Sequence, residues 1–132
     1  MNKAAGMFDV KINPLPPYNN SADAKLARMS IDKRFQGDLD ATSQGEMLSA
    51  GTDTKGSAGY VAIERVTGSL NDRSGSFALQ HNATLNRGAP YLNIVVIPDS
   101  GTGELAGLSG TMQIIIDKGK HSYEFEYGFS DA

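Results

Sequence analysis

Glu64 and His81 are the residues of this chain whose types and spacing best suit acid–base chemistry. Between them, the stretch SLNDRS predicts a tight turn at Asn71-Asp72, because Asn and Asp tolerate positive φ. If the two flanking strands pair from this turn, Glu64 and His81 stand on a cross-strand diagonal, about 7 Å apart at Cα. Both side chains then share one mostly apolar face, which we expect to point inward.

This pair predicts proton-transfer chemistry. A carboxylate on an apolar face has its charged form disfavoured, and a neighbouring imidazole could share its proton. Glu64 and His81 are therefore the candidate catalytic residues, with a buried structural ion pair as the alternative reading. The candidate ligand contacts are this pair and aromatic residues expected on the inward faces: Tyr60, Glu64, Phe77, His81 and Tyr123.

Other catalytic arrangements have little support. The chain has no cysteine, which excludes thiolate nucleophiles, zinc–sulfur sites and disulfides. His121 is expected near the Lys118-Gly119 turn, either at a barrel mouth or on the surface, and it lies on a different hairpin from His81. Nothing resembles the spacing of a zinc motif, so we expect no metal and no cofactor. Glu46 is expected to be a solvated strand residue.

The glycine-rich stretch VVIPDSGTGELAGLSG (95–110) follows a β-branched run, as a phosphate-binding turn would. A dinucleotide-binding turn aims a helix N-terminus at the pyrophosphate, but Gly103 and Gly107 leave no room for a crossover helix before the next strand. The stretch also lacks the Lys-Ser or Lys-Thr of a P-loop. We therefore expect a corner in a sheet, with Leu105 and Leu108 pointing inward.

Turn residues separate alternating apolar and polar segments along the whole chain, which predicts an all-β protein. The segment near 20–29 could form a short helix, but we expect a loop followed by a strand. Strands that number about eight are typical of a barrel or sandwich. They are expected around residues 8–12, which NPLPPYNN ends, and around 27–35, 39–50 (the weakest), 57–67, 75–85, 91–97, 110–117 and 121–129.

The last two strands predict a second hairpin with one apolar and one polar face. A turn at Lys118-Gly119 places Ile114 opposite Tyr123. Val95, Ile97 and Ile115 point away from the core and need cover, which a second subunit or the N-terminal segment could supply. We expect a homo-oligomer.

Size and charge limit the partners. The 132 residues predict a single domain spanning 1–132. The net charge is −3 and the basic residues are scattered, so nucleic acid is not an expected partner. No signal peptide or apolar stretch of spanning length is visible, which predicts a cytoplasmic protein without membrane contact.

Several blocks of the chain resemble known sequences. GTGELAGLSG (101–110) is similar to a turn shared by allene oxide cyclases and dirigent proteins. Together with GYVAIERVTGSLNDRSGSFALQHNATL, KHSYEFEY and RFQGDLDATSQGEMLSAGT, it more closely resembles a bacterial family of unknown function. The resemblance implies a closed, allene-oxide-cyclase-like barrel related to the calycins. It implies no reaction, because fold is weak evidence of function.

An eight-stranded barrel can be filled by side chains or hold one small ligand. Small residues expected to point inward favour a partial cavity: Ala41, Ser43, Gly59 and Ala62. The first hypothesis is therefore a protein that binds a small, mostly apolar ligand inside the barrel. The alternatives are an isomerase or cyclase-type enzyme that uses the Glu64–His81 pair, and a structural or regulatory oligomer without a ligand.

Overall fold

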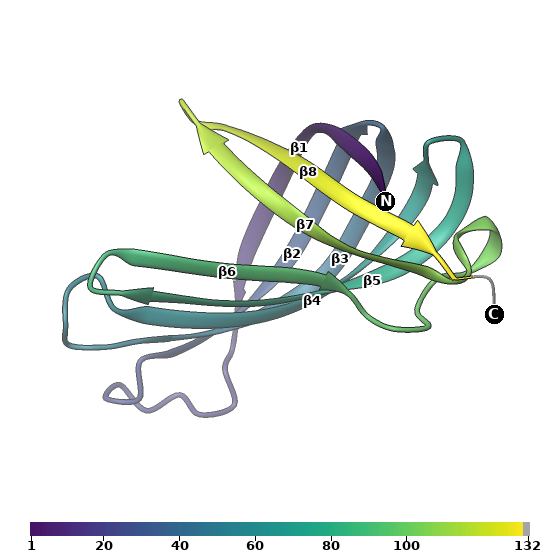
Figure 1. The fold of residues 1–132 in the computed structure, drawn as a ribbon. Coiled ribbons are helices and arrows are strands. Elements are labelled where there is room, and N and C mark those ends of the chain that lie inside the picture. The colour runs from purple at the N-terminus through teal and green to yellow at the C-terminus, as the bar shows by residue number, and fades with distance from the viewer. Residues whose placement is uncertain (131–132) are drawn as a thin grey trace.

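The computed structural model describes residues 1–130 and forms a closed, antiparallel barrel (Figure 1). Each strand pairs with its neighbour in the chain, and β1 pairs with β8 to close the ring. This confirms the all-β fold that the alternating pattern predicts and the closed barrel that the family resemblance implies. The strands are β1 (Asn2–Leu15), β2 (Leu26–Gly37), β3 (Leu39–Gly51), β4 (Ala58–Leu70), β5 (Arg73–Asn86), β6 (Ala89–Val96), β7 (Leu108–Asp117) and β8 (Lys120–Phe129).

Two strands are longer or more regular than the sequence indicates. β1 continues past the expected break, and Pro14 still lies opposite Met29 of β2. Proline is tolerated there because β8 pairs only with residues 2–7 of β1, so the far end of β1 has a free edge. β3, expected to be weak, is a continuous strand. The segment that precedes β2 is a loop and not a helix, as expected.

The two predicted tight turns set the register of their hairpins. Asn71 and Asp72 both have positive φ (45° and 71°), and Leu70 lies opposite Arg73. The Lys118-Gly119 turn likewise places Ile114 opposite Tyr123. Both registers are those predicted from the turn residues.

The glycine-rich stretch is a corner. It contains the single 3-10 turn η1 (Gly103–Leu105), and Leu105 and Leu108 are buried as expected. The loop packs directly on β5, since a Cβ atom at Gly75 would lie 2.0 Å from the Thr102 carbonyl oxygen. Within the loop, a Cβ atom at Gly101 would lie 1.9 Å from the Leu105 carbonyl oxygen, and Gly103 and Gly107 have positive φ (60° and 82°). These glycines therefore serve close backbone packing and the turn conformation.

The packed core fills only part of the barrel. Phe77 stacks on Phe125 with ring centroids 5.9 Å apart, and Tyr123 packs edge-on against Phe35 at 5.6 Å. The largest fully buried side chains are Tyr123, Phe35, Phe77, Phe125, Leu39, Leu70, Leu79, Ile94, Leu105, Glu64 and Val66.

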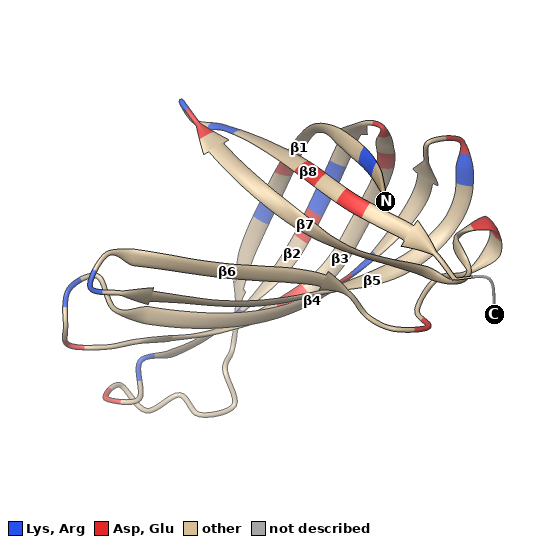
Figure 2. Cartoon of the chain, in the orientation of Figure 1, with Lys and Arg blue, Asp and Glu red and all other residues tan. Residues whose placement is uncertain are grey.

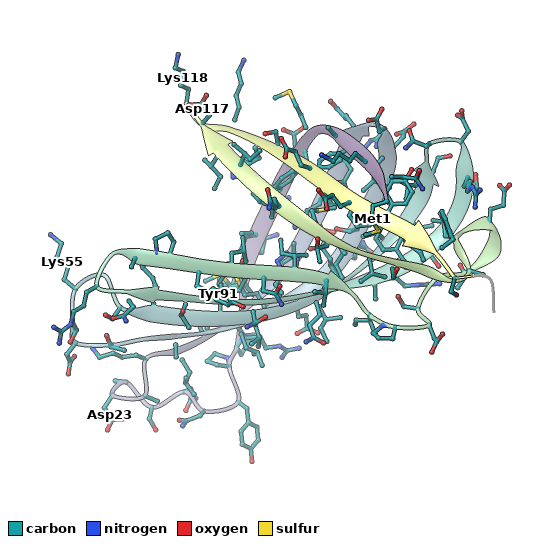
Figure 3. All side chains as sticks on the ribbon, viewed as in Figure 1. Met1, Asp23, Lys55, Tyr91, Asp117 and Lys118 are labelled. Carbon is teal, nitrogen blue, oxygen red and sulfur yellow. The ribbon has the colours of Figure 1, made fainter. Side chains whose placement is uncertain are left out.

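The barrel opens along the seam between β6 and β7. These strands pair at one position, Val95 opposite Thr111. From there β6 and the β7–β8 hairpin diverge, as Figure 1 shows. In Figure 3, Lys55 near the β3–β4 turn and Lys118 at the tip of the β7–β8 hairpin mark the separated ends. The strands beyond the core thus form an open, curved sheet whose inner surface is accessible.

Charged residues are spread over turns and strands, with both signs interspersed (Figure 2). Of the aliphatic residues expected to need cover, Ile115 is 41% exposed, while Val95 and Ile97 are half-buried. Their burial by a second subunit stays a prediction. Among residues 1–130, no helix has the length and apolarity needed to cross a membrane.

Candidate functional site

The β4–β5 hairpin brings Glu64 and His81 into direct contact. Ala62 lies opposite His81 and Glu64 lies opposite Leu79, which is the predicted register. The Nε2 atom of His81 is 2.6 Å from Oε2 of Glu64. Both residues are buried, with exposed fractions of 3% and 0%. The two side chains therefore share an enclosed site inside the barrel.

Two further residues complete this cluster, and neither was expected from the sequence to be a partner of Glu64. Lys33 of β2 donates a hydrogen bond from Nζ to Glu64 Oε2 at 2.8 Å. Ser43 of β3 donates from Oγ to Glu64 Oε1 at 2.7 Å. The carboxylate thus receives contacts from three neighbouring strands, and we call Lys33, Ser43, Glu64 and His81 the buried cluster.

Lys33 is placed by the alternation of β2. It stands between Ile31 and Phe35 on the inward face and is only 8% exposed. Its ammonium lies 5.1 Å from the ring centroid of Phe8 and 5.7 Å from that of Phe35, within range of cation–π attraction. The available signal in the sequence is its position in that apolar series, where a lysine is rarely buried without a partner.

The sequence predicts that the charged form of Glu64 is disfavoured, and this prediction is wrong. Burial by itself raises the pKa of its carboxyl group, and the prediction rests on this effect alone. The hydrogen bond from His81, together with the charge and hydrogen bond of Lys33, outweighs burial and lowers the pKa from 4.5 to about 2. Glu64 is therefore ionised at neutral pH and acts as a hydrogen-bond acceptor, not as a proton donor.

Gly45 of β3 provides the space that the cluster occupies. It lies opposite Ile31 on one side and Glu64 on the other. A Cβ atom at this position would lie 2.0 Å from the Ile63 carbonyl oxygen and 2.6 Å from the Glu64 Cα atom. Contacts this short require the backbone of β4 to shift.

Replacing Gly45 by alanine is expected to destabilise the protein by about 2 kcal/mol, the usual cost of overpacking. Gly59→Ala is the matched control, because a Cβ atom there would meet its nearest neighbour at an ordinary 3.4 Å. Urea unfolding of both variants checks this expectation. Equal stability of the two variants would show that β4 yields without cost.

An apolar hollow lies at the open end of the barrel. Its volume is about 490 Å³. Tyr60 and Ala83, which pair across β4 and β5, line it together with Met47 from β3 and Leu92 from β6. The Tyr60–Ala83 pair is the next inward position after the Ala62–His81 pair, so the buried cluster adjoins the hollow. The ring centroids of Tyr60 and His81 are 6.3 Å apart.

The other predicted contacts lie elsewhere. Phe77 is in the packed core. The Tyr123 hydroxyl donates to the carbonyl oxygen of Gln36 (2.8 Å) and accepts from the backbone N–H of Leu39 (3.0 Å), so it closes the β2–β3 turn instead of facing a ligand. His121 is half-buried against Phe8, with ring centroids 5.2 Å apart.

Two other residues named in the sequence analysis face outward. Glu46 is exposed, as expected, and pairs with Arg28. Gly59 was expected to point into the barrel, and this prediction is wrong. The inward positions on β4 are the even-numbered ones, such as Ala62, Glu64 and Val66.

Comparison with known proteins gives a family but no activity. A crystal structure of a protein with unknown function from Shewanella oneidensis MR-1, itself of the DUF3224 family, is 53% identical, with a TM-score of 0.96. The match covers 100% of this chain and 99% of that one. No curated protein matches the chain. The family model for "Protein of unknown function (DUF3224)" matches residues 4–127, and the chain therefore belongs to the DUF3224 family.

Proposed function

We propose that this protein binds a small, mostly apolar molecule in the hollow at the open end of its barrel. The observation that carries the proposal is an apolar hollow of about 490 Å³ that adjoins a buried polar cluster. Small-molecule sites have volumes of about 300–1,000 Å³, mostly apolar walls and a few fixed polar groups.

Exposed apolar side chains on the inner surface support the same proposal. Leu92 is 42% exposed, Leu85 is 38% exposed and Ile12 is 46% exposed, although each lies at an inward position of its strand. Apolar groups that converge on a concave surface gain free energy when an apolar ligand removes them from water.

The buried cluster has a positioning role in this proposal. Glu64 is fully enclosed and accepts from Lys33, Ser43 and His81, so a ligand in the hollow does not meet its carboxylate directly. The carboxylate instead fixes the imidazole of His81, which lies nearer the hollow beside Tyr60. The isomerase alternative has less support, since Glu64 is fully enclosed by its three partners and its carboxylate does not reach a molecule in the hollow.

A large side chain placed in the hollow is expected to block binding. Ala83→Trp fills the hollow and should weaken binding of Nile red, an uncharged fluorescent probe of apolar sites, by about tenfold or more. Thr67→Trp is the control, because Thr67 is exposed on the outward face of the same hairpin. Fluorescence titration of both variants, with thermal melting to confirm folding, provides the measurement. Unchanged affinity in a folded Ala83→Trp variant would place the probe outside the hollow.

A further inference from the structure

The imidazole of His81 has one nitrogen that the protein leaves without a partner. Within residues 1–130, Nδ1 of His81 is the buried side-chain polar atom that makes no hydrogen bond. The residue is 3% exposed, so bulk solvent does not replace the missing partner. Buried polar groups are nearly always hydrogen-bonded, and an exception calls for an explanation.

The other nitrogen determines what Nδ1 can do. Because Glu64 is ionised, its Oε2 only accepts, and His81 Nε2 must carry the hydrogen that it donates. The ammonium of Lys33, 2.8 Å from the same oxygen, balances the carboxylate charge. A neutral imidazole then leaves the cluster without net charge, and a buried excess charge is costly. In that state Nδ1 presents a bare lone pair, which accepts a hydrogen bond.

The position of His81 gives this lone pair a route to the hollow. Tyr60 lines the hollow and its ring lies beside the imidazole, at 6.3 Å between centroids. Ala83, the next inward residue of β5, also lines the hollow and offers only a methyl group. His81 itself does not line the hollow, so binding at Nδ1 requires the half-buried Tyr60 side chain to turn aside.

We propose that the polar end of the ligand is a neutral hydrogen-bond donor, a hydroxyl or N–H group, and that His81 Nδ1 accepts its hydrogen bond. This inference rests on the proposed binding function and adds the chemical class of the ligand. Carboxylates are disfavoured, since they would face a lone pair and the Glu64 anion. Lys33 does not offset this, because its ammonium is enclosed between Glu64, Phe8 and Phe35.

Three probes built on ten-carbon chains test the inference: decanol, decyl methyl ether and decanoate. The ether keeps the chain and the oxygen of decanol but lacks the donor hydrogen. We expect decanol to bind about two- to tenfold more tightly than the ether, the factor for one net hydrogen bond. In His81→Phe the ring offers no acceptor in place of Nδ1, so decanol and ether should bind equally. Calorimetric titration measures all six affinities.

The outcomes distinguish a failure of the donor assignment from a failure of the proposed binding function. Equal binding of decanol and ether to the wild-type protein, or tightest binding of decanoate, would overturn the donor assignment and leave the hollow as an apolar site. Failure of all three probes to bind would overturn both. If His81→Phe does not fold, nitrogen-15 NMR of the wild-type imidazole provides the second measurement. An unprotonated Nδ1 that shifts on addition of decanol supports the inference, and a protonated Nδ1 contradicts it.

Discussion

Replacing Glu64 by glutamine is expected to destabilise the protein by about 3–5 kcal/mol, because the variant leaves the Lys33 ammonium buried without its counter-charge. Glutamine keeps the shape of glutamate, so lost packing contributes little. Urea unfolding at neutral pH measures the change in the free energy of unfolding. A loss of this size would equal a large part of the total stability of a domain.

Two further variants test whether the unpaired charge of Lys33 causes the loss of stability in Glu64→Gln. Glu46→Ala removes a carboxylate that pairs with Arg28 on the outer surface, and it should leave the stability close to that of the wild type. Lys33→Met combined with Glu64→Gln removes both charges and should recover much of the loss, since apolar replacements of buried pairs are often tolerated. A double variant less stable than Glu64→Gln would show that the lysine is not the source of the cost.

The stability of the wild-type protein is expected to fall steeply in acid because of the same carboxylate. The pKa of Glu64 is lowered in the folded state, so its stabilisation is fully present above the usual glutamate pKa and disappears as the pH falls through the folded-state value. The shift from 4.5 to about 2 corresponds to roughly 3 kcal/mol for this buried group.

A comparison of the wild type with Glu64→Gln isolates this contribution from that of the other carboxylates. The difference in unfolding free energy between the two proteins should be largest near about pH 6 and should shrink towards zero near about pH 2. Urea titrations at several pH values give the difference. A gap that stays constant over this range would mean that Glu64 has the same pKa in the folded and the unfolded protein, and a gap that grows as the pH falls would mean that folding raises this pKa.

Much of the geometry of the site follows from a single turn. Asn71 and Asp72 fix the register of the β4–β5 hairpin, and the alternation of side chains then places Glu64 and His81 on the inward face. These are local relations, set by neighbours in the chain and by the turn type. For this reason they can be predicted from the sequence alone.

The partners of Glu64 depend on long-range relations. Lys33 lies two strands away from β4, and it reaches the carboxylate because Gly45, between them on β3, carries no side chain. Predicting this contact requires the registers of β2 with β3 and of β3 with β4 together. Burial is the largest single influence on the pKa of Glu64, and a prediction that lacks Lys33 misses both the charge and the hydrogen bond by which this lysine opposes it.

The alternation of apolar and polar residues also does not predict that one half of the barrel is filled and the other is open. Phe77 and Tyr60 both alternate inward, yet Phe77 lies in the packed core and Tyr60 lines the hollow. The difference arises at the seam, where β6 and β7 meet only at Val95 and Thr111. Alternation identifies the inward face of a strand but not the depth at which a residue lies along the barrel.

Native mass spectrometry of the protein purified from the organism that produces it tests the central claim most directly. We expect the wild-type chain to carry a noncovalent small molecule that denaturation releases, and the folded Ala83→Trp variant, whose hollow is filled, to lack it. Wild-type and variant chains that both show only the bare mass, or that both retain the same adduct, would contradict binding in the hollow.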